Sequence, residues 1–419
     1  MAEAMRRCFR LYALLLALAL ALLPACKSDI PDESSLSEGD ASFSGLSAES
    51  THESISEPAV PESSVAVQPS EAPDEQPGAQ PDKHDYIDSI ISGMTLEEKV
   101  GQLFLIRCPE IGAVEAVAQY HPGGYVLFAR DFKNQTRQSA ADNISGYQAQ
   151  SKLPLLIAVD EEGGTVNRVS LFKNFRAVPF WSPSALYDEG GFKLVESDAK
   201  EKAELLSSLG INVNLAPVCD LSHKGSYMFD RSFSPDAQLT SEFVARVVTV
   251  SQQNGVGAVL KHFPGYGDNA NTHTGIVVDN RSLDELISND FLPFQAGVSA
   301  GAGAILVSHN IISDVDPDSP ASLSSAMHEL LREKLGFDGV IITDDLSMDA
   351  VAEYTGGDIS HAAVAAVLAG NDMLCCTDYE LQYPALLAAV NSGDITVERI
   401  DRSVRRILLW KGKLGLMPQ

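Results

Sequence analysis

After the apolar run Val256 to Leu260 the chain reads Lys261-His262-Phe263-Pro264-Gly265-Tyr266-Gly267-Asp268-Asn269-Ala270-Asn271-Thr272-His273. The run predicts a buried strand that delivers Lys261 and His262 to its C-terminal end. The glycines and the proline that follow predict a loop, and we expect this loop to carry His273 back over the same strand end. Parallel α/β folds place their chemistry on such loops. A loop of scattered polar residues without a function is the alternative interpretation.

Seven other apolar segments resemble this strand and are separated by stretches long enough for helices. The eight candidate strands are Gln102–Ile106, Tyr125–Phe128, Leu155–Val159, Val213–Pro217, Ala258–Leu260, Ala304–Val307, Val340–Ile342 and Asp372–Leu374. Strands rich in Val, Ile and Leu that alternate with helices are typical of a parallel sheet covered on both faces. Eight such units predict an α/β fold of the (β/α)8 TIM-like barrel type. A doubly wound open sheet is the alternative, but no GxGxxG or P-loop motif supports it.

The composition argues against several classes of function. A net charge of −27 makes nucleic acid a poor partner for this chain. The six cysteines are not spaced as a disulfide framework, and neither a CxxC motif nor a His-rich stretch predicts zinc. We therefore expect neither a metal nor a cofactor.

The N-terminal 84 residues differ in character from the rest of the chain. Arginines precede an apolar run from Leu11 to Leu23, which suits the core of a signal peptide and is short for a membrane span. Residues 27–84 hold 13 acids against 2 bases and are rich in Ser and Pro, so we expect a disordered, extended linker. The predicted organisation is a signal peptide at 1–26, a linker at 27–84 and one barrel domain at 85–419.

The leader ends in Leu23-Pro24-Ala25-Cys26-Lys27. This resembles the lipobox of bacterial lipoproteins, which implies that Cys26 is lipidated and becomes the mature N-terminus. The protein would then be extracytoplasmic and anchored to the bacterial cell membrane, with the linker as a stalk. Pro24 is unusual at its position, and an ordinary secretory signal with an incidental cysteine is the alternative.

Polar residues also follow four other predicted strands. They are Asp160-Glu161-Glu162-Gly163-Gly164, then Asp220 with Phe229-Asp230-Arg231-Ser232-Phe233, then Ser308-His309-Asn310, and last Thr343-Asp344-Asp345-Leu346-Ser347-Met348. In a barrel the carboxyl ends of all strands meet at one mouth. Carboxylates, a guanidinium, an ammonium and imidazoles would gather there, which is the set of groups that binds and cleaves a sugar.

Six stretches together resemble glycoside hydrolase family 3, and most closely its bacterial β-N-acetylglucosaminidase branch. They are Ala158-Val-Asp-Glu-Glu-Gly-Gly164, Asn214-Leu-Ala-Pro-Val218, Asp230-Arg-Ser-Phe233, Lys261-His-Phe-Pro-Gly265, Thr272-His273 and Ile342-Thr-Asp-Asp-Leu-Ser-Met348. The resemblance implies a barrel fold and a retaining exo-glycosidase. Its substrate would be terminal β-linked N-acetylglucosamine on peptidoglycan fragments or other glycans.

The resemblance also implies roles for single residues. It places the catalytic nucleophile at Asp344, and Asp345 is the alternative nucleophile. A purely structural role as a helix N-cap is the other interpretation of either residue. It matches the family's sugar-binding residues to Asp160, Arg231, Lys261 and His262, for which a structural ion-pair network is the alternative. Met348 would pack against the sugar or its N-acetyl group, or else lie in a helix core.

In this branch a loop histidine acts as general acid/base beside an aspartate two residues earlier, which here gives His273 and Asn271. An amide oxygen can accept the ring N–H but brings no charge, so a protonated ring would be less stabilised. We therefore expect reduced but real hydrolase activity. Asp268 lies in the same loop and could supply the missing carboxylate. A less anionic loop would also tolerate phosphate in place of water as the acceptor.

Two other functions remain open from the sequence. A β-glucosidase or β-xylosidase of the same family is one, although such relatives commonly take their acid/base from another domain. A catalytically weak sugar-binding lipoprotein is the other, and Asn271 is the feature that favours it. A monomer is the simplest expectation for the oligomeric state, which the sequence does not determine.

Overall fold

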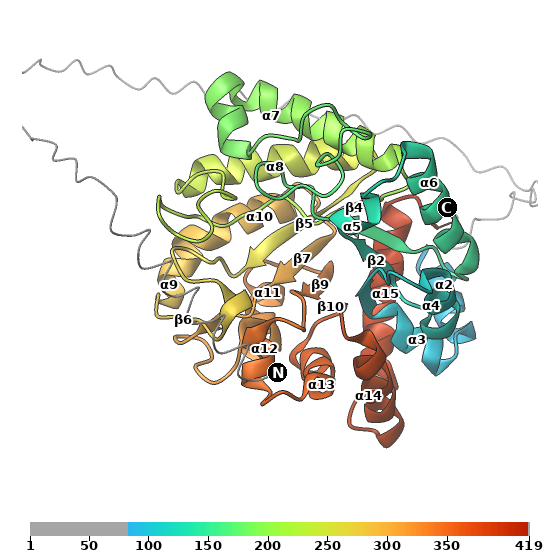
Figure 1. The fold of residues 1–419 in the computed structure, drawn as a ribbon. Coiled ribbons are helices and arrows are strands. Elements are labelled where there is room, and N and C mark those ends of the chain that lie inside the picture. The colour runs from blue at the N-terminus through green and yellow to red at the C-terminus, as the bar shows by residue number, and fades with distance from the viewer. Residues whose placement is uncertain (1–82, 418–419) are drawn as a thin grey trace, which may run out of the picture. The chain divides into compact units, whose positions relative to one another are not determined.

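The computed structural model describes residues 83–417, so the predicted signal peptide, the lipidated Cys26 and nearly all of the linker lie outside the described residues. Eight parallel strands form one sheet in the order β10-β1-β2-β3-β4-β5-β7-β9 (Figure 1). Their bounds are β1 Phe104–Arg107, β2 Gly124–Leu127, β3 Leu156–Val159, β4 Val213–Asn214, β5 Gly257–Phe263, β7 Ala304–Val307, β9 Val340–Thr343 and β10 Leu374–Cys376. Two short strands, β6 Val278–Asp279 and β8 Ile311–Ile312, form a separate parallel pair.

The sheet closes almost completely on itself. Its two outer strands, β9 and β10, meet where Ile342 bridges to Met373 just before β10, and the Thr343 N–H donates to the Met373 carbonyl at 3.2 Å. The (β/α)8 barrel predicted from the sequence is therefore confirmed. Each of the eight predicted segments overlaps one barrel strand, and the ends differ by a few residues. Gln102, for example, ends a helix rather than starting β1.

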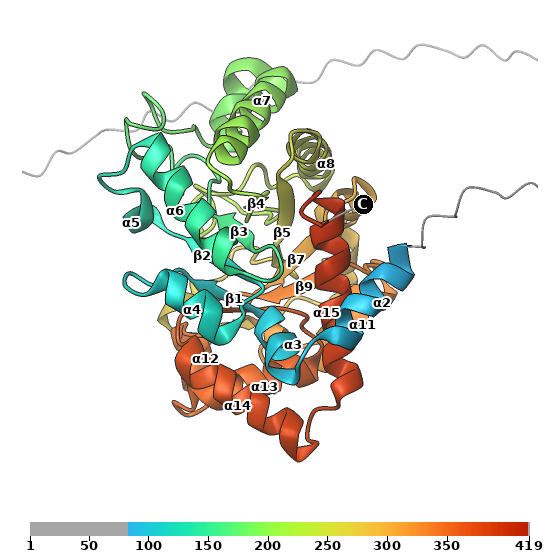
Figure 2. The same cartoon turned by 90° about the vertical axis from the view of Figure 1, so that its right-hand side faces the viewer.

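Helices form the outer layer of the barrel (Figures 1 and 2). They are α2 Lys83–Gly93, α3 Leu96–Gln102, α4 Ala113–Tyr120, α5 Ala129–Phe132, α6 Arg137–Gln150, α7 Pro183–Ser208, α8 Ala237–Gln253, α9 Leu283–Glu285, α10 Phe291–Ser299, α11 Ser325–Glu333, α12 Asp349–Tyr354, α13 Ile359–Ala369, α14 Tyr379–Ser392 and α15 Val397–Lys413. Short turns of other helix types are η1 Thr272–Thr274, η2 Leu286–Asp290 and η3 Ala321–Leu323. No helix within residues 83–417 combines the length and the apolar character that a bilayer crossing needs.

The strands are buried along almost their whole length because both faces are covered. All four residues of β2, β3, β7 and β9 are buried, and so are all seven of β5. This explains why their sequences are apolar without a polar alternation. The last residues of β5 are the exception in composition, because Lys261 and His262 are buried polar groups. Buried charges need partners, and their partners define the site described below.

Lys411 on α15 is a buried cation at the opposite end of the barrel. Its Nζ lies 2.7 Å from the Gln102 side-chain oxygen, and within residues 83–417 it has no acidic partner. Burial lowers the pKa of Lys411 to about 7. The unfolded chain keeps the proton up to its ordinary pKa of about 10.4. Between these values the unfolded state binds more protons, so the free energy of unfolding rises with pH.

We predict that Lys411 adds about 1–2 kcal/mol to this free energy from pH 7 to about 8.5, at up to about 1.4 kcal/mol per pH unit and bound proton. The buried cysteines, whose pKa values burial raises, oppose the gain as the pH approaches the ordinary thiol pKa of about 8.5, so the gain is the difference between the wild type and Lys411→Met. Urea unfolding of the wild type and Lys411→Met at both pH values measures the difference. The exposed Lys413 provides the control. An unchanged slope in Lys411→Met would contradict the prediction.

Candidate active site

An ion-pair network links the ends of β3 and β5 at the mouth of the barrel. Lys261 Nζ lies 2.8 Å from an Asp160 oxygen and 2.6 Å from a Glu162 oxygen, and its side chain is almost fully buried. Burial favours the neutral amine, but the two carboxylates outweigh it and raise the pKa of Lys261. The ammonium is therefore charged and held between two acids that follow the same strand.

Glu162 also binds Arg231 through two parallel hydrogen bonds. Arg231 Nε and Nη2 donate to the two Glu162 oxygens at 3.0 and 2.7 Å. Burial opposes ionisation of Glu162, but Lys261 and Arg231 together hold its pKa well below the usual range. Glu162 was missing from the site residues proposed from the sequence. Its position in the Asp160-Glu161-Glu162 run, directly after a buried strand, could have identified Glu162 as a site residue.

The same network fixes the state of His262. Its Nε2 lies 3.2 Å from Arg231 Nη2, and its Nδ1 lies 2.7 Å from an Asp220 oxygen. Because a guanidinium can only donate, Nε2 must accept and Nδ1 must carry the proton that Asp220 accepts. Both ring nitrogens are thus engaged within the protein. Asp220 is fully buried and also accepts the Tyr266 N–H at 2.7 Å.

The two adjacent acids after β9 have different surroundings. One Asp345 oxygen accepts from the Ser347 N–H and hydroxyl at 2.9 and 2.8 Å, and the other accepts from the Thr377 hydroxyl at 2.7 Å. Asp344 accepts one hydrogen bond, from the Asp345 N–H at 2.9 Å. Within the part of the chain that the structure describes, its second oxygen has no hydrogen-bond partner. Asp344 is therefore the acid with an oxygen available to a ligand.

The charge state of Asp344 follows from its neighbours. Burial raises the pKa of Asp344, whereas the positive charge that the nearby His262 and His309 carry when they are protonated, together with the Asp345 N–H, lowers it below its usual value. His309 donates from Nε2 to the Asp345 carbonyl at 3.0 Å and pairs through Nδ1 with Ser322 at 2.7 Å. Asp344 is thus an ionised carboxylate. Met348 is buried a few residues on, at the N-terminus of α12.

His273 lies exposed on the loop after β5, in the turn η1. Its N–H and its ring Nδ1 lie 2.9 and 2.7 Å from the same side-chain atom of Asn271. A backbone N–H is always a donor, so this atom is the amide oxygen and Nδ1 must carry a proton. Nε2 is left to exchange a proton with a ligand.

Asp268 is not brought to His273, contrary to the expectation that it could replace the missing carboxylate. Instead it accepts from the His223 N–H at 2.8 Å and lies 3.0 Å from His223 Nδ1. These bonds hold the pKa of Asp268 below its usual value. His223 lies on the loop after β4. Asp268 is therefore bound by a residue from another loop and is not available to His273.

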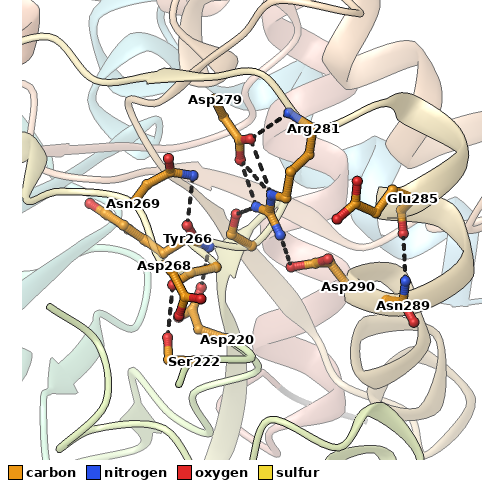
Figure 3. A network of polar contacts seen from close by, with 12 residues as sticks. Asp220, Ser222, Tyr266, Asp268, Asn269, Asp279, Arg281, Glu285, Asn289 and Asp290 are labelled. Carbon is orange, nitrogen blue, oxygen red and sulfur yellow. Dashed lines mark hydrogen bonds and ion pairs between the residues drawn. The ribbon is translucent and has the colours of Figure 1, made fainter. Parts of the chain in front are cut away.

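Two contacts hold the loop that carries His273. Arg281 donates from Nη2 to the Gly265 carbonyl at 2.8 Å, which joins the two ends of the loop, and from Nη1 to Asp290 at 2.8 Å (Figure 3). Burial raises the pKa of Asp290 to about 6, although Arg281 opposes the shift. Farther along, the Ile276 N–H donates to Glu353 Oε2 on α12 at 3.1 Å. No role for Arg281 or Glu353 was predicted from the sequence.

A family model and the most similar curated relatives point to the same protein family. The model of the Glycosyl hydrolase family 3 N terminal domain matches residues 95–409. A β-hexosaminidase of Xanthomonas campestris pv. campestris is 34% identical over 300 residues, which are 70% of this chain and 89% of that protein. A β-hexosaminidase of Stenotrophomonas maltophilia is 33% identical over 297 residues, covering 70% and 87%.

A solved structure is also similar. It is a glycoside hydrolase family 3 β-N-acetylglucosaminidase from Paenibacillus sp., with a TM-score of 0.72 and 33% sequence identity. The match covers 78% of this chain and 64% of that one. With the barrel, the network at its mouth and these matches, the chain belongs to glycosyl hydrolase family 3.

Proposed function

We propose that this glycoside hydrolase is an exo-acting β-N-acetylhexosaminidase that removes terminal β-linked N-acetylglucosamine with retention of configuration. The observation that carries the proposal is the second oxygen of Asp344, which has no partner among the described residues, whereas both oxygens of Asp345 are bound by Ser347 and Thr377. The names of the similar proteins, which are β-hexosaminidases and a β-N-acetylglucosaminidase, support this substrate class.

The proposed reaction has two steps. First, Asp344 attacks the anomeric carbon while the bond to the leaving oxygen breaks, and His273 gives that oxygen the proton on Nε2. Then water attacks the anomeric carbon, His273 accepts its proton at Nε2, and the ester bond to Asp344 breaks. Asn271 keeps the Nδ1 proton in place throughout.

The network around Lys261 would hold the terminal sugar. Asp160 has one oxygen 3.7 Å from an Arg168 nitrogen and the other on Lys261, and its side chain is partly exposed beside these two cations. Such an acid accepts hydrogen bonds from sugar hydroxyls. Arg231 and His262 belong to the same network, and their bonds to each other, to Glu162 and to Asp220 fix their orientation before the sugar arrives. Preorganised polar groups of this kind lower the cost of ordering a site.

A panel of aryl glycosides tests the activity. We expect turnover of the β-N-acetylglucosaminide and little turnover of the β-glucoside or β-xyloside. A fluorinated N-acetylglucosamine analogue should leave a sugar adduct whose mass maps to Asp344. Asn271 favours a second candidate, a sugar-binding protein with little activity. Tight sugar binding without an adduct and without turnover would support that candidate instead.

The proposed setting is outside the cytoplasm. We propose that Cys26 is lipidated, that residues 27–84 link the barrel to the membrane, and that the substrates are peptidoglycan fragments or similar glycans. Leu11 to Leu23 and the residues up to Lys27 support this proposal by their resemblance to a lipoprotein leader. Expression of the wild type and Cys26→Ser followed by detergent partition tests it. Equal recovery of both proteins in the aqueous phase would rule the anchor out.

A further inference from the structure

The loop after β5 is held at its two ends, and the candidate acid/base lies at its tip, residues 273–276. At the first end the Tyr266 N–H donates to Asp220 at 2.7 Å (Figure 3). At the second end the Ile311 N–H of β8 donates to the Val277 carbonyl at 2.9 Å. These bonds fix the ends of the loop, so the position of the tip between them depends on other contacts.

One side chain from another element reaches this loop tip. The Ile276 N–H donates to Glu353 Oε2 on α12 at 3.1 Å. Within residues 83–417 this is the one hydrogen bond that joins residues 273–276 to another element, because the remaining ones run back to Asn271 in the same loop. Glu353 is therefore the polar contact that fixes where the loop tip lies.

The backbone of the loop tip permits this contact. Gly275 has a φ of 138°, a conformation that residues with a side chain rarely adopt. A Cβ at this position would lie 3.2 Å from the same Glu353 oxygen, which is closer than such atoms usually approach. Glycine at position 275 thus lets the carboxyl group reach the Ile276 N–H.

Glu353 also belongs to the helix that follows Asp344 in the chain. The Met348 N–H, at the start of α12, donates to the Asp345 carbonyl at 3.1 Å and so joins the helix to the turn that holds both acids. Val351 is fully buried in the hydrophobic core and fixes the helix to the barrel. A short, anchored helix therefore connects the proposed nucleophile with the contact that holds the proposed acid/base.

We propose that Glu353 is a positioning residue for the reaction, which holds the Ile276 N–H and thereby keeps the His273 ring where it can protonate the leaving oxygen. The inference rests on the proposed function, because it uses the roles that His273 and Asp344 have there. Glu353 acts through the loop tip and not on the substrate itself. Its loss should therefore weaken proton transfer to the leaving group and spare the attack by Asp344.

Kinetics with two leaving groups test the proposal. N,N′-diacetylchitobiose (chitobiose) has a leaving group that needs a proton, whereas a dinitrophenyl β-N-acetylglucosaminide has one that leaves without it. Glu353→Ala should lower kcat/KM for chitobiose by about 3- to 10-fold, the usual scale of one lost hydrogen bond. It should lower kcat/KM for the dinitrophenyl glycoside by less than about 2-fold.

Three further variants separate positioning from a general structural role. Glu353→Gln keeps an oxygen that can accept the Ile276 N–H, so it should retain most of the chitobiose activity. Asp349→Asn changes an exposed acid on the same helix and should alter neither substrate's kinetics. In a His273→Ala background, Glu353→Ala should cause no further loss with chitobiose, because its effect passes through the imidazole.

Hydrogen exchange measures the loop contact without using activity. The Ile276 amide loses its acceptor in Glu353→Ala, so the peptide that contains it should exchange faster than in the wild type and in Asp349→Asn. Unchanged exchange, equal losses for both leaving groups, or a further loss in the His273→Ala background would each overturn the positioning role, even if the enzyme hydrolyses β-N-acetylglucosaminides. A wild type that turns over neither glycoside, with faster exchange in Glu353→Ala, would overturn the proposed function and leave the loop tip assigned to Glu353.

Discussion

Asp344→Asn should lower kcat for the aryl β-N-acetylglucosaminide on the order of 10⁴-fold or more, the scale seen when a nucleophile is removed. Asparagine has the same shape and can still accept the Asp345 N–H, so the turn after β9 should keep its structure. An amide cannot form the glycosyl ester, and the two-step route is closed. Steady-state kinetics together with a melting curve measure the loss and show that the fold is kept.

Asp345→Asn is the matched control, because it changes the neighbouring acid in the same turn. Asp345 holds Ser347 and Thr377, so its loss should lower stability and reduce activity much less than the loss of Asp344. A second control is Asp344→Gly with azide, which should attack from the vacated face and give the α-glycosyl azide. A larger loss in Asp345→Asn than in Asp344→Asn would reverse the assignment.

His273→Ala should have an effect that depends on the leaving group. A poor leaving group such as the second sugar of chitobiose needs a proton, so its kcat/KM should fall about 10² to 10⁴-fold. A dinitrophenyl glycoside leaves without a proton, and its kcat/KM should fall far less. The alkaline limb of the pH profile for chitobiose should disappear in the variant. A loss of the same size for both leaving groups would argue that His273 has another role.

Asn271→Asp tests the neighbour of the imidazole separately. The new carboxylate would lie where the amide oxygen now accepts the Nδ1 proton, and its charge favours the protonated ring. The alkaline limb of kcat/KM should therefore move to higher pH, and turnover of poor leaving groups should rise. Asn271→Ala removes the acceptor without adding charge and should lower the rate. An unchanged pH profile in Asn271→Asp would show that the ring is not the group that titrates.

The barrel could be predicted because each strand is recognisable from the apolar pattern of its own few residues. Strands such as Leu155–Val159 and Ala304–Val307 are apolar throughout, and only a sheet covered on both faces needs that pattern. The meeting of Asp160 with Lys261 was predictable for a related reason. Parallel strands end at the same edge, so polar residues that follow them gather there although they lie 101 positions apart.

The pairing of charges inside the site was not predictable in the same way. Asp268 lies near His273 in the sequence but is bound by His223, which is 45 positions away on another loop. Asp268 binds His223 and not His273 because of the paths that the two loops take in space. These paths cannot be predicted from a local sequence pattern. Glu162 was missed for a similar reason, because its role depends on two cations from different places, Lys261 on β5 and Arg231 on the loop after β4.

Arg281 closes the segment that carries His273 into a ring of its own, since it holds the Gly265 carbonyl from the other end. Two further attachments lie inside this ring, because the Tyr266 N–H donates to Asp220 and the Ile276 N–H donates to Glu353 on α12. A laboratory that exchanges the segment must therefore keep these points. The positions between them, around His273, are the ones through which proton transfer can be retuned while the sugar pocket stays the same.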